Sequence, residues 1–148
     1  GDWSSDVCSS DLTLFHRVVK EPVPFVVQGG DPQTADPKVP PMQYGTGSFI
    51  DPATGAARLI PLELQLSGEP RPRYGQQLLE VGEVRRLKLL HLRGAVAMAR
   101  AEDPNSASSQ FYVALKPLPE LDGRYAVFGQ GMQQAISAIR QAPARWPT

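Results

Sequence analysis

DPNSASSQFYV, at residues 103–113, joins a polar, turn-forming segment directly to an aromatic and β-branched one. Asp, Pro, Asn and Ser favour turns, because their side chains or rings restrict the local backbone or bond to it. Phe, Tyr and Val favour strands, where bulky side chains pack well on a pleated surface. The run therefore predicts a loop that leads into a strand beginning near Phe111.

Three further segments stand in a fixed order around this run. FHRVV at residues 15–19 and FVVQGGD at residues 25–31 precede it, and LDGRYAVFG at residues 121–129 follows it. The first two predict strands at 14–19, with Phe15 facing inward, and at 25–28, followed by a turn at 29–32 that includes Asp31. Residues 31–58 are rich in Pro, Gly, Asp and Thr and predict a loop. The chain also has 15 prolines and 13 glycines, which separate short apolar runs. This punctuation favours a mostly β fold with many loops over a helical bundle.

Taken together and in this order, these segments resemble the cyclophilin-type peptidyl-prolyl cis-trans isomerases. The resemblance extends from about Phe15 to Gly129, and insertions at 20–24 and 67–86 are similar to those of cyanobacterial members. It implies a closed antiparallel β-barrel with capping helices. It also implies an isomerase, active on X–Pro bonds in peptides and folding proteins, that works as a folding chaperone without a cofactor.

Arg17 is the catalytic residue that the resemblance implies, because it matches the arginine of the family's Phe-His-Arg segment. A cation near the prolyl nitrogen favours the twisted amide over the planar one. An isolated arginine on an edge strand is usually a solvated surface residue. The catalytic interpretation therefore depends on the other segments being present.

The resemblance also implies a substrate-binding set. Its members are apolar residues for the proline ring, glutamines for the substrate backbone, and a strand edge that pairs with the peptide. They are Phe25, Val26, Gln28, Ala99, Arg100, Gln110, Tyr112, Leu121 and Tyr125. Taken singly, each could instead be a core residue or a polar strand end.

Four residues depart from the common family pattern. Val26 stands in place of Met and shortens one wall, and Arg100 replaces a frequent asparagine. Tyr112 stands in place of Phe, so its hydroxyl needs a hydrogen-bonding partner or water. Glu120 occupies the position of a tryptophan in cyclosporin-sensitive members, which predicts weak cyclosporin binding.

The composition does not favour a nucleic-acid-binding protein, a membrane-spanning protein or a metalloprotein. The 15 basic and 15 acidic residues give no net charge, which does not favour a nucleic-acid partner. The sequence has no run of 18 apolar residues, so it predicts no membrane-spanning helix. His16 and His91 are the only histidines, which is too few for an ordinary metal site, so we expect none.

The two ends call for separate expectations. Residues 1–12 match the translation of a sequencing-library adapter, so we expect a non-native segment there and a partial isomerase domain over 13–148, incomplete at the N-terminus. The segment 133–140 has helical character, and the tail beyond it shows no strand alternation, which fits either an incomplete C-terminus or a divergent native tail. Two alternatives to an isomerase remain open: a module that binds proline segments without turnover, and a truncated, inactive fragment.

Overall fold

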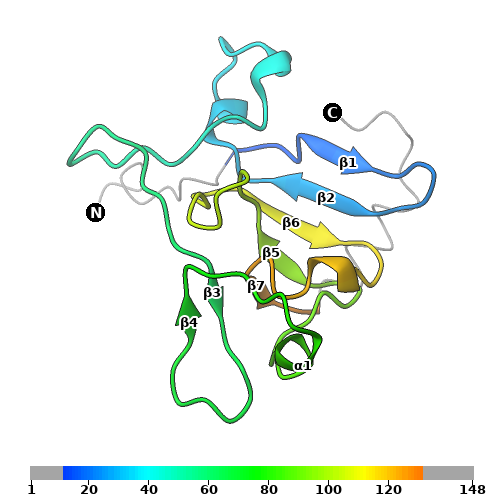
Figure 1. The fold of residues 1–148 in the computed structure, drawn as a ribbon. Coiled ribbons are helices and arrows are strands. Elements are labelled where there is room, and N and C mark those ends of the chain that lie inside the picture. The colour runs from blue at the N-terminus through cyan, green and yellow to red at the C-terminus, as the bar shows by residue number, and fades with distance from the viewer. Residues whose placement is uncertain (1–11, 132–148) are drawn as a thin grey trace.

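The computed structural model describes residues 12–131, and Figure 1 shows its architecture. The expectations for residues 1–11, and for a helix at 133–140 and the tail beyond it, lie outside the described residues. A five-stranded antiparallel sheet forms the centre of the described part. Its strands are β1 (Arg17–Val19), β2 (Val26–Gly29), β5 (Val96–Met98), β6 (Phe111–Ala114) and β7 (Val127–Gly129). They lie in the order β1-β2-β6-β5-β7.

The register of this sheet aligns the segments that sequence patterns singled out. Arg17 pairs with Gln28, and Gln28 pairs with Tyr112 on the next strand. Tyr112 pairs in turn with Ala97 of β5. Because directly opposed residues share a face, one row across four strands carries a cation, an amide and an aromatic ring side by side.

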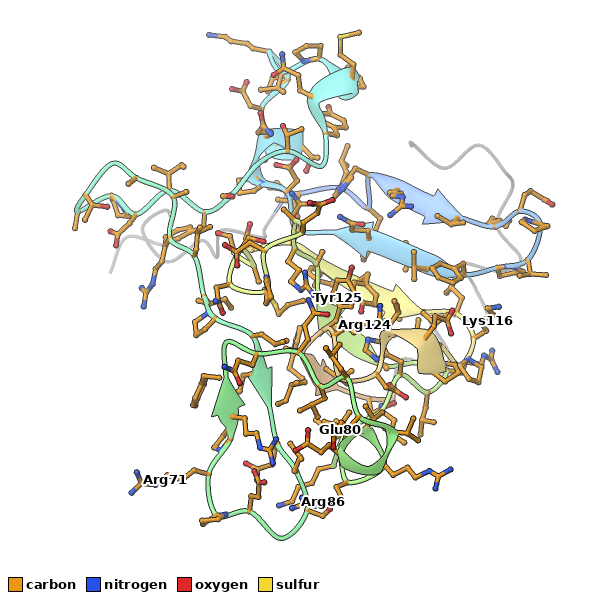
Figure 2. The ribbon with its side chains drawn as sticks, viewed as in Figure 1. Arg71, Glu80, Arg86, Lys116, Arg124 and Tyr125 are labelled. Carbon is orange, nitrogen blue, oxygen red and sulfur yellow. The ribbon has the colours of Figure 1, made fainter. Side chains whose placement is uncertain are left out.

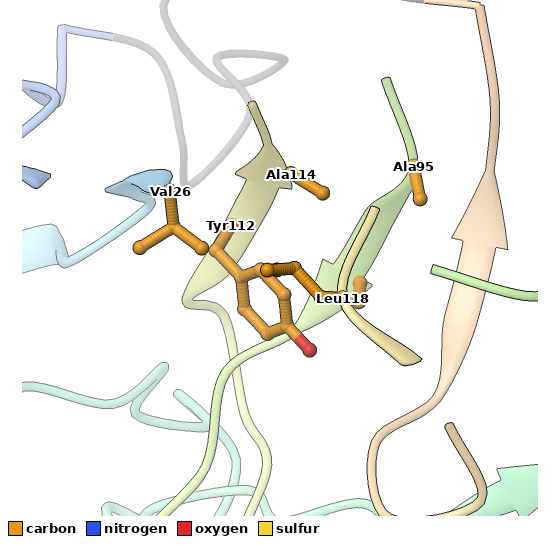
Figure 3. Close-up of a cluster of buried hydrophobic side chains, with 6 residues drawn as sticks. Val26, Ala95, Tyr112, Ala114 and Leu118 are labelled. Atoms are coloured by element: carbon orange, nitrogen blue, oxygen red, sulfur yellow. The ribbon is translucent and has the colours of Figure 1, made fainter. Parts of the chain in front are cut away.

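Apolar side chains pack on both faces of the sheet. Val26, Ala97 and Tyr112 belong to a cluster with Ala95, Ala114 and Leu118. Figure 3 shows Tyr112 and Leu118 within this cluster. The alternating residues Val27, Val113 and Leu115 are buried on the opposite face. Consecutive apolar residues in these short strands fit this arrangement, since a strand buried on both faces needs apolar side chains on both.

A second, two-stranded sheet lies beside the main one. β3 (Glu63–Leu64) pairs with β4 (Arg73–Tyr74), and α1 (Val81–Val84) follows close by. Leucines hold this unit together: Leu62, Leu64, Leu66, Leu78 and Leu87 form one buried cluster. Arg73 bonds to both Glu69 and Glu83, tying the β3–β4 connection to α1. The insertion at 67–86 therefore has secondary structure of its own.

The predicted loop region at 31–58 contains two short helical turns, at Pro32–Ala35 and Pro41–Gln43, and one isolated β-bridge between Ile50 and Ala57. A third such turn, Pro119–Leu121, leads into residues 122–124. The mostly β fold is thus confirmed, with helices that are few and short within residues 12–131. None of the helices in this range is long and apolar enough to cross a membrane.

The first strand is shorter than the sequence predicts, the second is shifted by one residue, and one side-chain placement was wrong. The strand expected at 14–19 forms only over Arg17–Val19. Phe15, expected to face inward, is 37% exposed, although its ring packs edge-on against Phe111 at 6.2 Å. His16, next to it, is buried instead.

Candidate active site

A groove of about 280 Å³ lies on the face of the sheet that carries Tyr112. Residues in or next to strands β1, β2 and β6 line one part of it, and residues after β5 and before β7 line the rest. The structure places nine of the ten residues predicted from sequence in the lining of this groove. They are Arg17, Phe25, Val26, Gln28, Ala99, Arg100, Tyr112, Leu121 and Tyr125.

The apolar part of the groove is an arrangement of packed rings and branched side chains. Val26 and Tyr112 are buried, while Phe25, Leu121 and Tyr125 pack against them partly exposed. The rings of Tyr112 and Tyr125 meet edge to face, with centroids 5.8 Å apart. Aromatic pairs prefer this geometry, because the positive edge of one ring faces the negative face of the other.

A chain of polar side chains borders the apolar part. The Arg17 guanidinium donates to Gln28 Oε1 at 3.4 Å, and Gln28 Nε2 donates to Gln110 Oε1 at 2.9 Å. Gln110, the tenth predicted residue, is buried and donates to the backbone oxygen of Gly47 at 2.8 Å. Gln110 thus lines, together with Gln28, a neighbouring pocket rather than this groove, and it links Arg17 indirectly to the 45–47 turn.

Asp31 holds that turn in place. Its fully buried carboxylate accepts hydrogen bonds from the backbone N–H groups of Gln33 at 2.9 Å, Gly45 at 2.6 Å and Gly47 at 3.2 Å. Gly47 must lack a side chain, because a Cβ there would collide with the Asp31 carboxylate. Sequence reasoning treated Asp31 only as part of a turn. The glycine turn that followed at 44–48 was the available signal for its role.

The Tyr112 hydroxyl forms a hydrogen bond within the protein, which meets the need for a partner or water predicted from the sequence. It lies 2.7 Å from His91 Nε2, and His91 Nδ1 lies 2.9 Å from Asp122 Oδ1. Burial raises the pKa of Tyr112 well above its usual range, with a smaller contribution from Tyr125. Burial also lowers the pKa of His91, although the hydrogen bond to Asp122 opposes this. Both groups are therefore uncharged near neutral pH.

The far rim carries a second cation. The Arg100 guanidinium lies 4.4 Å from the centre of the Tyr125 ring, a cation–π contact. It also donates to the backbone oxygens of Ala101, Glu102 and Arg124, with the shortest bond at 2.6 Å to Arg124. Figure 2 shows Arg124 and Tyr125 on this side of the sheet.

Ala99 directly follows β5, and Glu120 lies on the Pro119–Leu121 turn. The backbone N–H of Ala99 is bonded to Gln110 O at 3.0 Å, so this donor is already used within the sheet. Glu120 is exposed on the Pro119–Leu121 turn, next to the groove residue Leu121. No three His, Cys, Asp or Glu side chains within residues 12–131 lie close enough together to hold a metal ion.

Comparison with known proteins gives a consistent result. The model of the family described as "Cyclophilin type peptidyl-prolyl cis-trans isomerase/CLD" matches residues 6–146. The chain is 42% identical over 115 residues to Peptidyl-prolyl cis-trans isomerase CYP38, chloroplastic, of Arabidopsis thaliana. It is equally identical over the same length to a Synechocystis sp. protein named as a thylakoid lumen isomerase. These matches cover 71% of this chain but only 24% and 28% of the two relatives.

Solved structures share the fold. A cyclophilin-type isomerase of Cryptosporidium parvum superposes with a TM-score of 0.58 at 24% identity, covering 90% of this chain and 63% of that one. The same protein, crystallised in the presence of the dipeptide Ala-Pro, gives a TM-score of 0.57 at 25% identity, covering 91% and 65%. With the family model matching nearly the whole sequence, the chain belongs to the cyclophilin-type peptidyl-prolyl cis-trans isomerase family.

Proposed function

We propose that this chain accelerates rotation about X–Pro bonds in peptides and unfolded polypeptides, with the proline in the Tyr112 groove and Arg17 as the catalytic cation. The observation that carries the proposal is the position of Arg17. It stands at the edge of an apolar groove, bonded through Gln28 to a buried glutamine. The Cryptosporidium parvum protein crystallised in the presence of Ala-Pro supports a proline-containing substrate.

The reaction needs electrostatic stabilisation rather than a nucleophile. A peptide bond resists rotation by about 18–20 kcal/mol, because resonance gives the C–N bond double-bond character. In the twisted state the prolyl nitrogen becomes pyramidal and regains a lone pair. A cation fixed near that nitrogen interacts more strongly with the twisted state than with the planar one, and this difference lowers the barrier.

Each part of the groove has a task in this mechanism. Phe25, Val26, Tyr112 and Leu121 would hold the proline ring while the preceding residue turns. The Gln28–Gln110 pair would limit the motion of the Arg17 side chain, which is otherwise exposed. A cation that is already oriented requires little reorganisation when charge develops.

Exchange spectroscopy on a short Ala-Pro peptide tests the function. We expect catalytic amounts of the chain to produce cis–trans exchange peaks, and saturating peptide to shift the amide signals of Val26 and Tyr112. Shifts at these amides without faster exchange would instead support a proline-binding module. Neither effect, from a chain with dispersed amide signals, would contradict the proposal.

A further inference from the structure

A buried series of three side chains lies directly behind the groove. Asp122 Oδ1 is 2.9 Å from His91 Nδ1 and 2.7 Å from the backbone nitrogen of His91. His91 Nε2 is 2.7 Å from the Tyr112 hydroxyl. His91 is only 2% exposed and does not line the groove, whereas Tyr112 does. The His91 side chain therefore bonds directly to a groove residue through the Tyr112 hydroxyl.

The direction of each hydrogen bond follows from the groups involved. An ionised carboxylate only accepts, so His91 Nδ1 carries a proton and donates a hydrogen bond to Asp122 Oδ1. A neutral imidazole then has an acceptor at Nε2, and the Tyr112 hydroxyl donates to it. The planes of the two rings differ by 12°, and their centroids lie 5.8 Å apart.

On the basis of the proposed function, we propose that His91 and Asp122 are positioning residues that keep the Tyr112 ring in place as the apolar floor of the proline groove. A phenol at this position could otherwise turn its polar end toward water in the groove. The bond to His91 uses the hydroxyl proton on the buried side, where Leu118 also packs in the same cluster. The groove then presents the ring face to the proline, with Val26 beside it (Figure 3).

A double-mutant cycle separates this role from simple packing. His91→Leu keeps the volume and the backbone bonds of residue 91 but removes the acceptor. The Tyr112 hydroxyl is then buried without a partner, which is more costly than losing both partners together. We expect kcat/KM to fall about tenfold in His91→Leu, mainly because KM rises.

The decisive measurement is whether a second substitution, Tyr112→Phe, restores the activity lost in His91→Leu. The variant His91→Leu/Tyr112→Phe has no hydroxyl to satisfy, so its kcat/KM should return to within about threefold of Tyr112→Phe alone. Leu66→Ala serves as the control for lost stability, because Leu66 is fully buried in the separate leucine cluster. Full activity in His91→Leu, or a double variant no better than His91→Leu, would overturn the proposal.

Nitrogen NMR of the unmodified chain gives a second readout, which does not depend on activity. We expect the His91 proton on Nδ1 and an unprotonated Nε2 near neutral pH. A proton on Nε2 would overturn the proposal, since Tyr112 could not then donate to that atom. A chain with the expected tautomer that leaves the Ala-Pro peptide unaffected would overturn the proposed function, and the hydrogen-bond assignment would stand.

Discussion

The side-chain amide of Gln28 donates a hydrogen bond to Gln110 Oε1 at 2.9 Å, although 82 residues separate the two in sequence. The same Gln28 accepts from Arg17, so an exposed guanidinium is tied to a buried amide. The antiparallel register makes this possible, because Gln28 stands between Arg17 and Tyr112 in the same row of the sheet.

Replacing Gln110 should therefore weaken catalysis without removing any group from the groove lining. Gln110→Leu leaves the Gln28 amide without its acceptor and Gly47 O without its donor. We expect kcat/KM for the Ala-Pro peptide to fall about tenfold, the scale of an unsatisfied buried polar group. Gln65→Leu is the matched control, since Gln65 donates to two backbone oxygens outside the groove. Equal activity in both variants would show that the glutamine pair does not position Arg17.

Asp31 should contribute more to stability than an ordinary surface carboxylate. Asp31→Ala removes the acceptor of three backbone N–H groups at a fully buried position. We expect urea unfolding to show a loss of about 2–4 kcal/mol, because bonds to charged acceptors are strong and the donors are left unpaired. The exposed Asp36 accepts from Lys38 N at 2.9 Å, so Asp36→Ala should cost less than about 1 kcal/mol. Similar losses in the two variants would contradict this account of the turn.

The free energy of unfolding should decrease in mildly acidic solution because of two buried histidines. Burial lowers the pKa of His91 and of His16, against the opposing influence of Asp122 and Asp31 respectively. As the pH falls through about 6.5, the unfolded chain takes up these protons before the folded chain does. Stability is therefore highest above about pH 6.5 and falls below it, by at most about 1.4 kcal/mol per pH unit for each histidine.

Urea midpoints measured across this pH range check the sign of the effect. His91→Leu should show a shallower pH dependence than the unmodified chain, because one of the two groups no longer titrates. A midpoint that rises as the solution becomes acidic would mean that burial does not control these histidines.

Cyclosporin should bind weakly, as the glutamate at position 120 predicts. Glu120 is exposed on the turn that carries the groove residue Leu121. Glu120→Trp should tighten binding by about 1–3 kcal/mol, the scale of one apolar contact plus a hydrogen bond. Titration calorimetry of both proteins measures the difference. Tight binding by the unmodified chain would show that the tryptophan is unnecessary here.

Much of the central sheet could be predicted from sequence, because its strands are marked by short runs of neighbouring residues. The runs around Phe25 and Phe111 combine β-branched and aromatic residues with clear turn signals, and both form strands. The groove residues followed from the family resemblance, since their spacing matched over most of the chain. Strand ends differed by a few residues, as at β1, where hydrogen bonding rather than composition decides the boundary.

The polar contacts behind the groove could not be predicted in the same way. His91 and Asp122 are 31 residues apart, and no period or motif links a lone histidine to a turn aspartate. Their meeting depends on how Leu118 and Leu121 pack in the cluster that contains Tyr112, which is a tertiary property. Tyr112 gave the only hint, because a phenol in an apolar cluster requires a partner.

The most direct test of the account is the rate of Ala-Pro isomerisation catalysed by Arg17→Ala, measured by exchange spectroscopy. Arg71→Ala is the matched control, because Arg71 is an exposed arginine that points away from the sheet beyond β4 (Figure 2). We expect kcat/KM to fall about 100-fold or more in Arg17→Ala, the effect of losing one electrostatic stabiliser, and to stay unchanged in Arg71→Ala. Equal rates in the unmodified chain and in Arg17→Ala would contradict the central role given to this cation.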